Sequence, residues 1–359
     1  MIYIRNRYLG IVTFLLYLVL GIIIGVFIYH FFKVKPIQGL DSSDLAHYIT
    51  LISGIFTCIS VLLLYLTLRS HTIEQLKNEF ERRYYELIRF HCQNVAEMCF
   101  RDPGNTSKTI CQGKEVFQKI HLQIEQAIWD IAPFFRGVEP ENYYKNESVL
   151  EEDMINKHIA TNNIPLNRLN QYNIAYLIVF FGLNKQGENI LKDILGKKYK
   201  SDFFIPILGF CANRQTVYSK TILSFLTGKK KQYYSGHQIR LGHYFRHLFQ
   251  TVVFVNETPL FTYEEKYDYI RILRTHLSPY EQSVFFFNSL SSLGRGWEIG
   301  QSIEGNCLDY QLITKYDLIR NIPYSFSQVN VRTKLFYPLV EYEWGDRVTE
   351  KRALRKHYK

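Results

Sequence analysis

Charged residues are scarce at the start of this sequence. The first 68 of its 359 residues include only Arg5, Arg7, Lys33, Lys35, Asp41 and Asp44. Two runs of 21 residues, 9–29 and 48–68, contain no charge at all. At about 1.5 Å per helical residue, each run covers a hydrocarbon core of about 30 Å. The sequence therefore predicts a two-helix transmembrane hairpin, and the absence of charge within it argues against an ion relay or a transport path.

Cations flank the two runs, whereas the short loop between them carries both signs. Arg5 and Arg7 precede the first run and Arg69 follows the second. The positive-inside rule then predicts a multi-pass protein with both termini in the cytoplasm. Small side chains at helical spacing predict close packing of these helices, either within the hairpin or between copies in a homo-oligomer. These side chains are Gly21, Gly25, Ser53, Thr57 and Ser60.

Motifs for metals, cofactors and nucleotide hydrolysis are absent from the sequence. The six cysteines form no CxxC pair, which indicates reduced thiols in a cytosolic compartment rather than disulfides or a zinc site. There is no Rossmann glycine fingerprint. Gly228–Lys231 lacks the preceding glycine and the following Ser or Thr of a Walker loop. We therefore expect no cofactor and no metal.

The remainder of the chain is charged and has helical periodicity. From Arg69 onward, 39 basic residues face 31 acidic ones, and a net charge of +8 suits either an anionic leaflet or a nucleic acid. The pattern predicts a mainly α fold, with a helix over 69–100 extending from the membrane and a helical cytoplasmic domain over 101–359. Helices are expected at Glu115–Phe135, Gly236–Val255, Thr262–Leu277, Pro279–Leu293 and Tyr310–Asn321.

Two local features of this domain carry separate expectations. Ser278, Pro279 and Glu281 have the spacing of a helix cap, a first-turn proline and a capping box. The final segment, Arg347–Lys359, carries six basic residues and one acidic one. It is predicted to be a solvated basic tail, or to contact anionic headgroups.

Histidine and arginine gather between Tyr233 and Gln250. His243 and His247 are four residues apart, as in a metal pair, but no acidic residue supports them. Arg240 with His247, and Arg271 with His276, are similar to the Arg–His pairs of HEPN-type ribonucleases, in which arginine stabilises phosphate charge and histidine moves a proton. Leu241 and Ile272 stand where that motif usually has a polar residue. The weak catalytic candidates are Arg240, His243, Arg246, His247, Arg271 and His276, with structural use or phosphate binding as the alternatives.

Four segments resemble one protein family. They are Gly236–His237 continuing through His243–Phe249, Leu277–Glu281, Asn288–Gly294 (NSLSSLG) and Tyr316–Ile322 (YDLIRNI). Together they are similar to phage abortive-infection proteins of the AbiC type, whose members commonly have two N-terminal spans and a helical cytoplasmic region. The resemblance implies antiphage defence at the bacterial inner membrane, with a partner protein or nucleic acid such as a retron complex. It supplies no catalytic residues.

Three functions remain open at this point. The first is a membrane-anchored defence effector that perturbs the lipid bilayer or arrests growth when a phage trigger acts on it. The second is a membrane-tethered HEPN-like ribonuclease or nucleic-acid-binding domain that uses the Arg–His cluster. The third is a membrane sensor that passes a signal to another protein.

Overall fold

The structure is a computed structural model, and it describes residues 42–101, 110–149, 166–217, 234–298, 311–324, 326, 331–345 and 348–358, together with Gly21, Gly25 and Tyr29. The predicted first span, 9–29, otherwise lies outside the described residues. The chain divides into two compact units. Unit 1 comprises Met1–Tyr85 and Pro259–Thr262, and unit 2 comprises Glu86–Thr258 and Tyr263–Lys359.

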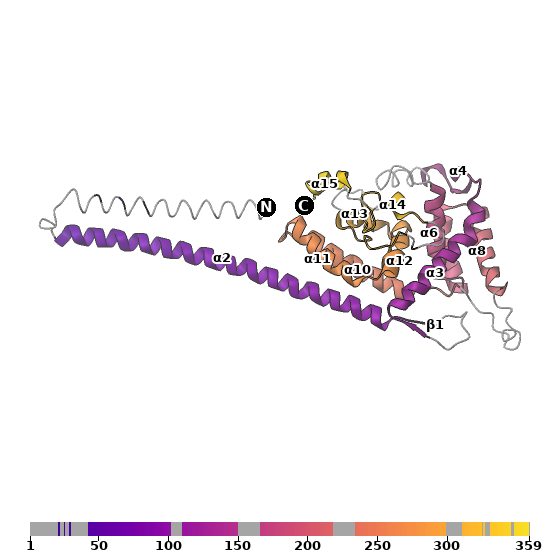
Figure 1. Cartoon of the computed structure of the whole chain (residues 1–359), viewed down its shortest axis with the longest axis horizontal. Coiled ribbons are helices and arrows are strands. Elements are labelled where there is room, and N and C mark those ends of the chain that lie inside the picture. The colour runs from indigo at the N-terminus through magenta and orange to yellow at the C-terminus, as the bar shows by residue number, and fades with distance from the viewer. Residues whose placement is uncertain are drawn as a thin grey trace. The chain divides into compact units, whose positions relative to one another are not determined.

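Helices dominate the described residues, which confirms the predicted mainly α class (Figure 1). The only strands among them form one short antiparallel pair. The elements are α2 (Ser42–Glu97), β1 (Cys99–Arg101), β2 (Ile110–Gln112), α3 (Lys114–Ile131), η3 (Ala132–Phe135), α4 (Pro140–Tyr143), α6 (Leu166–Phe181), α7 (Lys185–Lys198), α8 (Ser201–Val217), α10 (Gln238–Glu257), α11 (Tyr263–His276), α12 (Pro279–Leu290), η4 (Arg295–Trp297), α13 (Leu312–Tyr316), α14 (Thr333–Phe336) and α15 (Thr349–Arg355).

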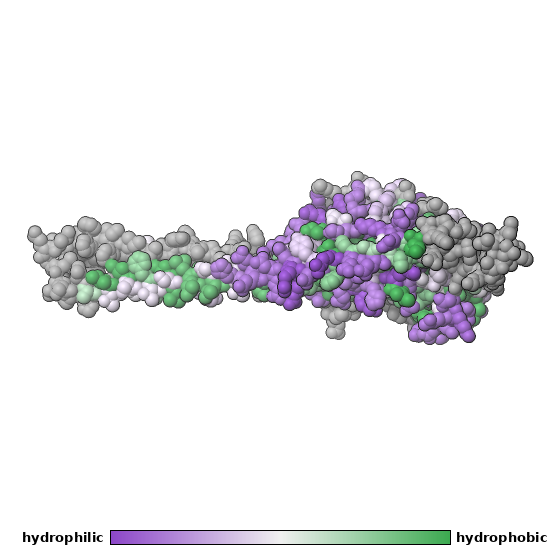
Figure 2. Space-filling model, turned by 90° about the horizontal axis from the view of Figure 1, so that it is seen from below, coloured by the Kyte–Doolittle hydropathy of each residue, from purple (hydrophilic) through white to green (hydrophobic). Residues whose placement is uncertain are grey.

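The part of α2 before Arg69 has a largely apolar surface, whereas the stretch that follows is hydrophilic (Figure 2). Phe56, Val61, Leu64 and Leu68 are each more than half exposed. In the described part of the chain, only this helix is long and apolar enough to cross a membrane, and none of its apolar window is buried inside the protein. A core helix of a water-soluble domain would bury that surface. The segment is therefore built for an apolar environment outside the protein, which suggests membrane association.

Hydroxyl groups in the same segment are satisfied by their own helix. Ser53 donates to the Thr50 carbonyl, Thr57 to the Ser53 carbonyl and Ser60 to the Phe56 carbonyl, at 2.8 to 2.9 Å. Such bonds leave no hydroxyl proton without an acceptor if the segment lies in lipid. Side chains added at Gly21 or Gly25 would meet nothing within 4 Å. Helix packing through these small residues stays a prediction.

Unit 2 is built around three helices, α3, α6 and α12, which pack against one another (Figure 1). Apolar residues recur at helical spacing on α3 and form a buried stripe, with Val116, Ile120 and Ile124 completely enclosed. Helix α6 is buried on nearly every side, in agreement with the apolar run 174–181 in its second half. Three successive phenylalanines of α12, 285–287, complete the core.

Local signals located the start of α12, and tertiary contacts changed other boundaries. The Ser278–Glu281 capping box is present, and α12 begins at Pro279 as predicted. The expected helix Tyr310–Asn321 is shorter, because α13 ends at Tyr316 and Asp317 adopts a left-handed conformation with φ 52°. The expected solvated tail is also different, because Lys351 of α15 is completely buried. Its partners are described below.

Candidate functional site: a basic pocket beside α10

Two backbone segments meet where α6 ends and α10 begins. The amide of His237 donates to the Phe180 carbonyl at 2.8 Å. Gly182 and Gly236 have φ values of 77° and 87°, which side chains disfavour. A Cβ on Gly236 would lie 2.6 Å from the Phe181 carbonyl oxygen. Glycine at both positions therefore lets the α6–α7 turn lie directly against the start of α10.

This close approach brings the first turns of α7 and α10 to one pocket of about 530 Å³. Helix α7 is capped by Asn184, whose side chain accepts the Gly187 amide at 2.8 Å. The pocket is lined by Phe180, Phe181, Asn184, Gln186, Gly187, Ile190, Ser235, Gly236, Gln238, Ile239, Arg240, Gly242, His243 and Arg246. No carboxylate is among these residues.

Three of the basic residues singled out from the sequence share this pocket. Arg240, His243 and Arg246 follow one another at intervals of three along α10, so their side chains lie on one face. Arg240 is half-buried: its Nε donates to the Cys99 carbonyl at 2.7 Å, and its guanidinium lies 5.3 Å from the Phe100 ring centre. His243 and Arg246 are exposed. Within the described chain, none of the three basic residues has an ion-pair partner. The pocket is thus suited to an anion.

His247 lies outside this lining, in a cluster with the end of α2. Its ring centre is 6.3 Å from that of His91, which is almost completely buried and packs against Tyr244. Burial and the nearby His247 and His276 lower the pKa of His91 to about 4. Burial also lowers the pKa of His247. This histidine group is neutral at pH 7 and contributes to packing between α2 and α10.

The second Arg–His pair is also outside the pocket lining. Arg271 is exposed and pairs with Asp268 at 3.1 Å on its own helix. The His276 ring contacts Cys92, with Nδ1 and Sγ 3.6 Å apart. The structure therefore gathers Arg240, His243 and Arg246 and separates them from the remaining candidates. Among the described side chains, no three of His, Cys, Asp or Glu are grouped to hold a metal ion.

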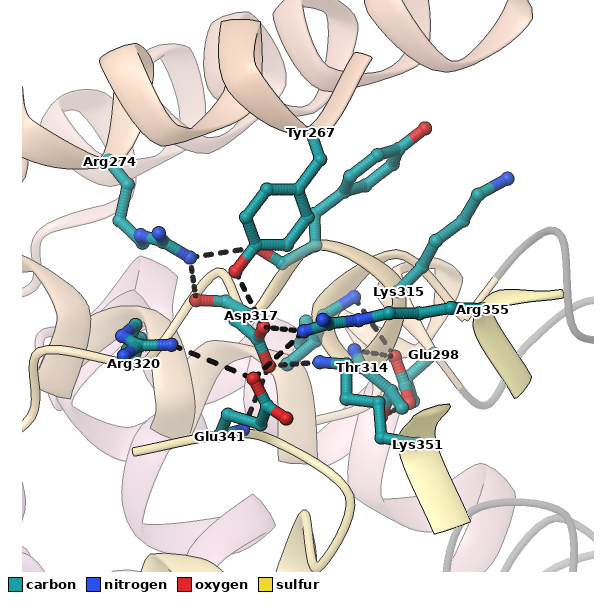
Figure 3. Close-up of polar contacts among 12 residues, drawn as sticks. Tyr267, Arg274, Glu298, Thr314, Lys315, Asp317, Arg320, Glu341, Lys351 and Arg355 are labelled. Carbon is teal, nitrogen blue, oxygen red and sulfur yellow. Dashed lines mark hydrogen bonds and ion pairs between the residues drawn. The ribbon is translucent and has the colours of Figure 1, made fainter. Parts of the chain in front are cut away.

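A buried charge network around Asp317 was not found by sequence reasoning (Figure 3). Asp317 and Lys351 are completely buried and form an ion pair. The Asp317 carboxylate also accepts from the Tyr267 hydroxyl and the Glu341 amide, both at 2.8 Å. Arg274 donates to the Asp317 carbonyl at 2.9 Å. Because the partners come from α11, the turn after α13 and α15, the network fixes the C-terminal helix to unit 2.

A second buried carboxylate lies beside this network. Glu298 accepts from the backbone amides of Ile313 and Thr314 at 3.0 and 3.1 Å. Burial raises its pKa to about 7, although these bonds and the nearby Lys351 oppose that effect. The YDLIRNI segment that contains Asp317 was noted in the sequence, but its partner Lys351 is 34 residues away. No local pattern links the two.

Residues 236–327 match the family described as "Putative phage abortive infection protein". The match confirms the AbiC-type family resemblance. The AbiC-type segment begins at Gly236, supplies all three basic side chains of the pocket, and extends past Asp317. It supports a role in abortive infection by phage. No curated protein and no solved structure matches the chain.

Proposed function

We propose that this protein is a membrane-anchored effector of abortive infection, which acts at the bacterial inner membrane when a phage is sensed. The observation that carries the proposal is the exposed apolar segment of α2, which has no charge between Asp44 and Arg69. Exposing one large apolar side chain to water forgoes about 1.5–3 kcal/mol of burial free energy. Several are exposed in this segment, so the bilayer is the environment that accounts for them.

An effector of this kind must connect the sensing of a phage with its action on the membrane. The continuity of α2 supports such a connection. The helix runs without interruption from Ser42 to Glu97, and its final turns, including His91 and Val95, are buried in unit 2. A trigger or partner that repacks unit 2 would therefore act on the same helix that enters the lipid. The small-residue faces at Gly21, Gly25, Ser53, Thr57 and Ser60 offer contacts between copies in a homo-oligomer. Depolarisation, followed by growth arrest, would be the outcome.

Membrane potential in infected cells tests this proposal. Cells carrying the protein are infected with a phage against which it protects, and a potential-sensitive dye is followed until lysis. We expect depolarisation before phage release, and none in cells lacking the protein. Growth arrest and protection with an intact potential would contradict the proposal.

A further inference from the structure

The basic pocket of unit 2 combines basic side chains with apolar ones. Besides Arg240, His243 and Arg246, its lining includes Phe180 and Ile239. Ile239 is 85% exposed, although it stands in the first turn of α10 next to a charged residue. A large aliphatic side chain gains nothing from water at this position. A ligand with both an anionic and an apolar part would contact both the basic and the apolar side chains of the lining.

Two helix starts reinforce the positive potential of the pocket. Helix α7 (14 residues) and helix α10 (20 residues) both place their first turns in its lining. The first amide groups of a helix lack intrahelical acceptors and carry partial positive charge, so two helix starts in one lining attract an anion, although Asn184 already accepts the Gly187 amide of α7. With three basic side chains and no carboxylate among the described lining residues, the preferred ligand group is a phosphate.

The volume of the pocket favours a phosphate ester over inorganic phosphate. Small-molecule sites typically occupy about 300–1,000 Å³, and this pocket has about 530 Å³. A second pocket of about 380 Å³ shares Phe180, Gly242 and Arg246 with it. The amide side chains of Asn184 and Gln238 add donors and acceptors to the lining.

We propose that this pocket binds a nucleoside phosphate. The phosphate group contacts Arg240, Arg246 and the two helix starts, and the planar base lies against the exposed side chain of Ile239. Arg246 is exposed and has no ion-pair partner among the described residues, so it is available to the ligand. The proposal goes beyond the effector function and does not depend on it, because it concerns binding by unit 2 and no action on the membrane.

Calorimetric titration of the full chain in detergent tests this assignment. The probes are ATP, GTP, CTP and UTP, with tripolyphosphate as the ligand that has phosphate but no nucleoside. Arg246→Ala removes a cation, Ile239→Glu introduces a repelling charge, and Arg271→Ala is the control, since Arg271 is an exposed arginine outside the pocket. We expect saturable binding of at least one nucleotide, weakened at least tenfold by each pocket variant and unchanged in the control. Tripolyphosphate should bind at least tenfold more weakly.

Three results would overturn the proposal. They are no binding of any of the four nucleotides, equal binding by the wild type and Arg246→Ala, and tripolyphosphate affinity equal to that of the nucleotides. Misfolding is separable from loss of binding, because the substituted side chains are exposed and the thermal midpoints should match that of the wild type. Affinity for the best nucleotide should also fall as salt concentration rises, because the phosphate contacts are screened.

Discussion

Between Phe56 and Leu68, α2 exposes large apolar side chains and no charge, whereas unit 2 completely encloses both Asp317 and Lys351. Large apolar side chains are costly in free energy when water surrounds them, and charged side chains are costly when hydrocarbon surrounds them. Exposed apolar surface is stable in hydrocarbon, and a buried charge is stable only where the protein itself supplies its partners. The exposed apolar surface of α2 suggests membrane association, whereas unit 2 supplies the partners of its buried charges itself.

Removing one partner of the buried ion pair should have the largest effect on stability. Lys351→Ala leaves Asp317 without its buried cation, and we expect a loss of about 3–5 kcal/mol in the free energy of unfolding. Urea titration followed by tryptophan emission, to which the buried Trp297 of unit 2 contributes, measures it. Lys356→Ala is the control, because Lys356 is exposed at the end of α15 and should change stability by less than about 0.5 kcal/mol. Equal losses in the two variants would contradict the role of the pair.

A charge placed in the apolar segment of α2 tests whether this segment anchors the protein in the membrane. Val61 is 62% exposed near the middle of the uncharged run. An aspartate at the centre of a membrane helix costs about 2.5–3.5 kcal/mol, so Val61→Asp should shift the protein from the membrane to the soluble or degraded fraction. Cell fractionation with detection of the chain measures this, and Val61→Leu is the conservative control. Undiminished membrane association of Val61→Asp would show that this segment is not the anchor.

His91, which packs against Tyr244 of α10, should have a smaller and pH-dependent effect on the free energy of unfolding. The unfolded chain binds a proton at His91 below about pH 6.5, but the folded protein does so only near pH 4. The native state therefore loses stability as the pH falls through this window, by up to about 1.4 kcal/mol per pH unit from this residue. His91→Leu should flatten the curve of unfolding free energy against pH between 6.5 and 4. The exposed His243→Leu is the control, and parallel curves for wild type and His91→Leu would refute the expectation.

Local sequence signals predicted elements whose determinants lie within a few residues of one another. The start of α12 follows from Ser278, Pro279 and Glu281, and the stripe of α3 follows from its helical spacing. The β1–β2 pair was not predicted, because three-residue strands such as Cys99–Arg101 are too short to show a period of two. Within the described residues, helices were thus easier to predict than this pair of short strands.

Only some of the residues of the candidate site could be predicted from the sequence. The sequence indicated Arg240, His243 and Arg246 as candidates, but it paired Arg240 and His243 with His247, which lies outside the pocket lining. Their meeting with the start of α7 depends on the contact between Gly182 and Gly236, which are more than fifty residues apart. The burial of Lys351 likewise depends on Asp317, so its charge pattern alone resembled a solvated tail. Spacing predicts neighbours along a helix and cannot predict partners across the fold.

Phage protection by a shortened chain tests the central claim most directly. The variant lacks residues 1–68 and keeps the helix from Arg69 onward together with the whole of unit 2. Plaque counts are compared between cells expressing it and cells expressing the full chain at equal abundance, with circular dichroism of the purified variant to verify its helices. The account predicts that protection is lost while the helical signal remains. Full protection by the shortened, folded chain would contradict it and assign the activity to unit 2 alone.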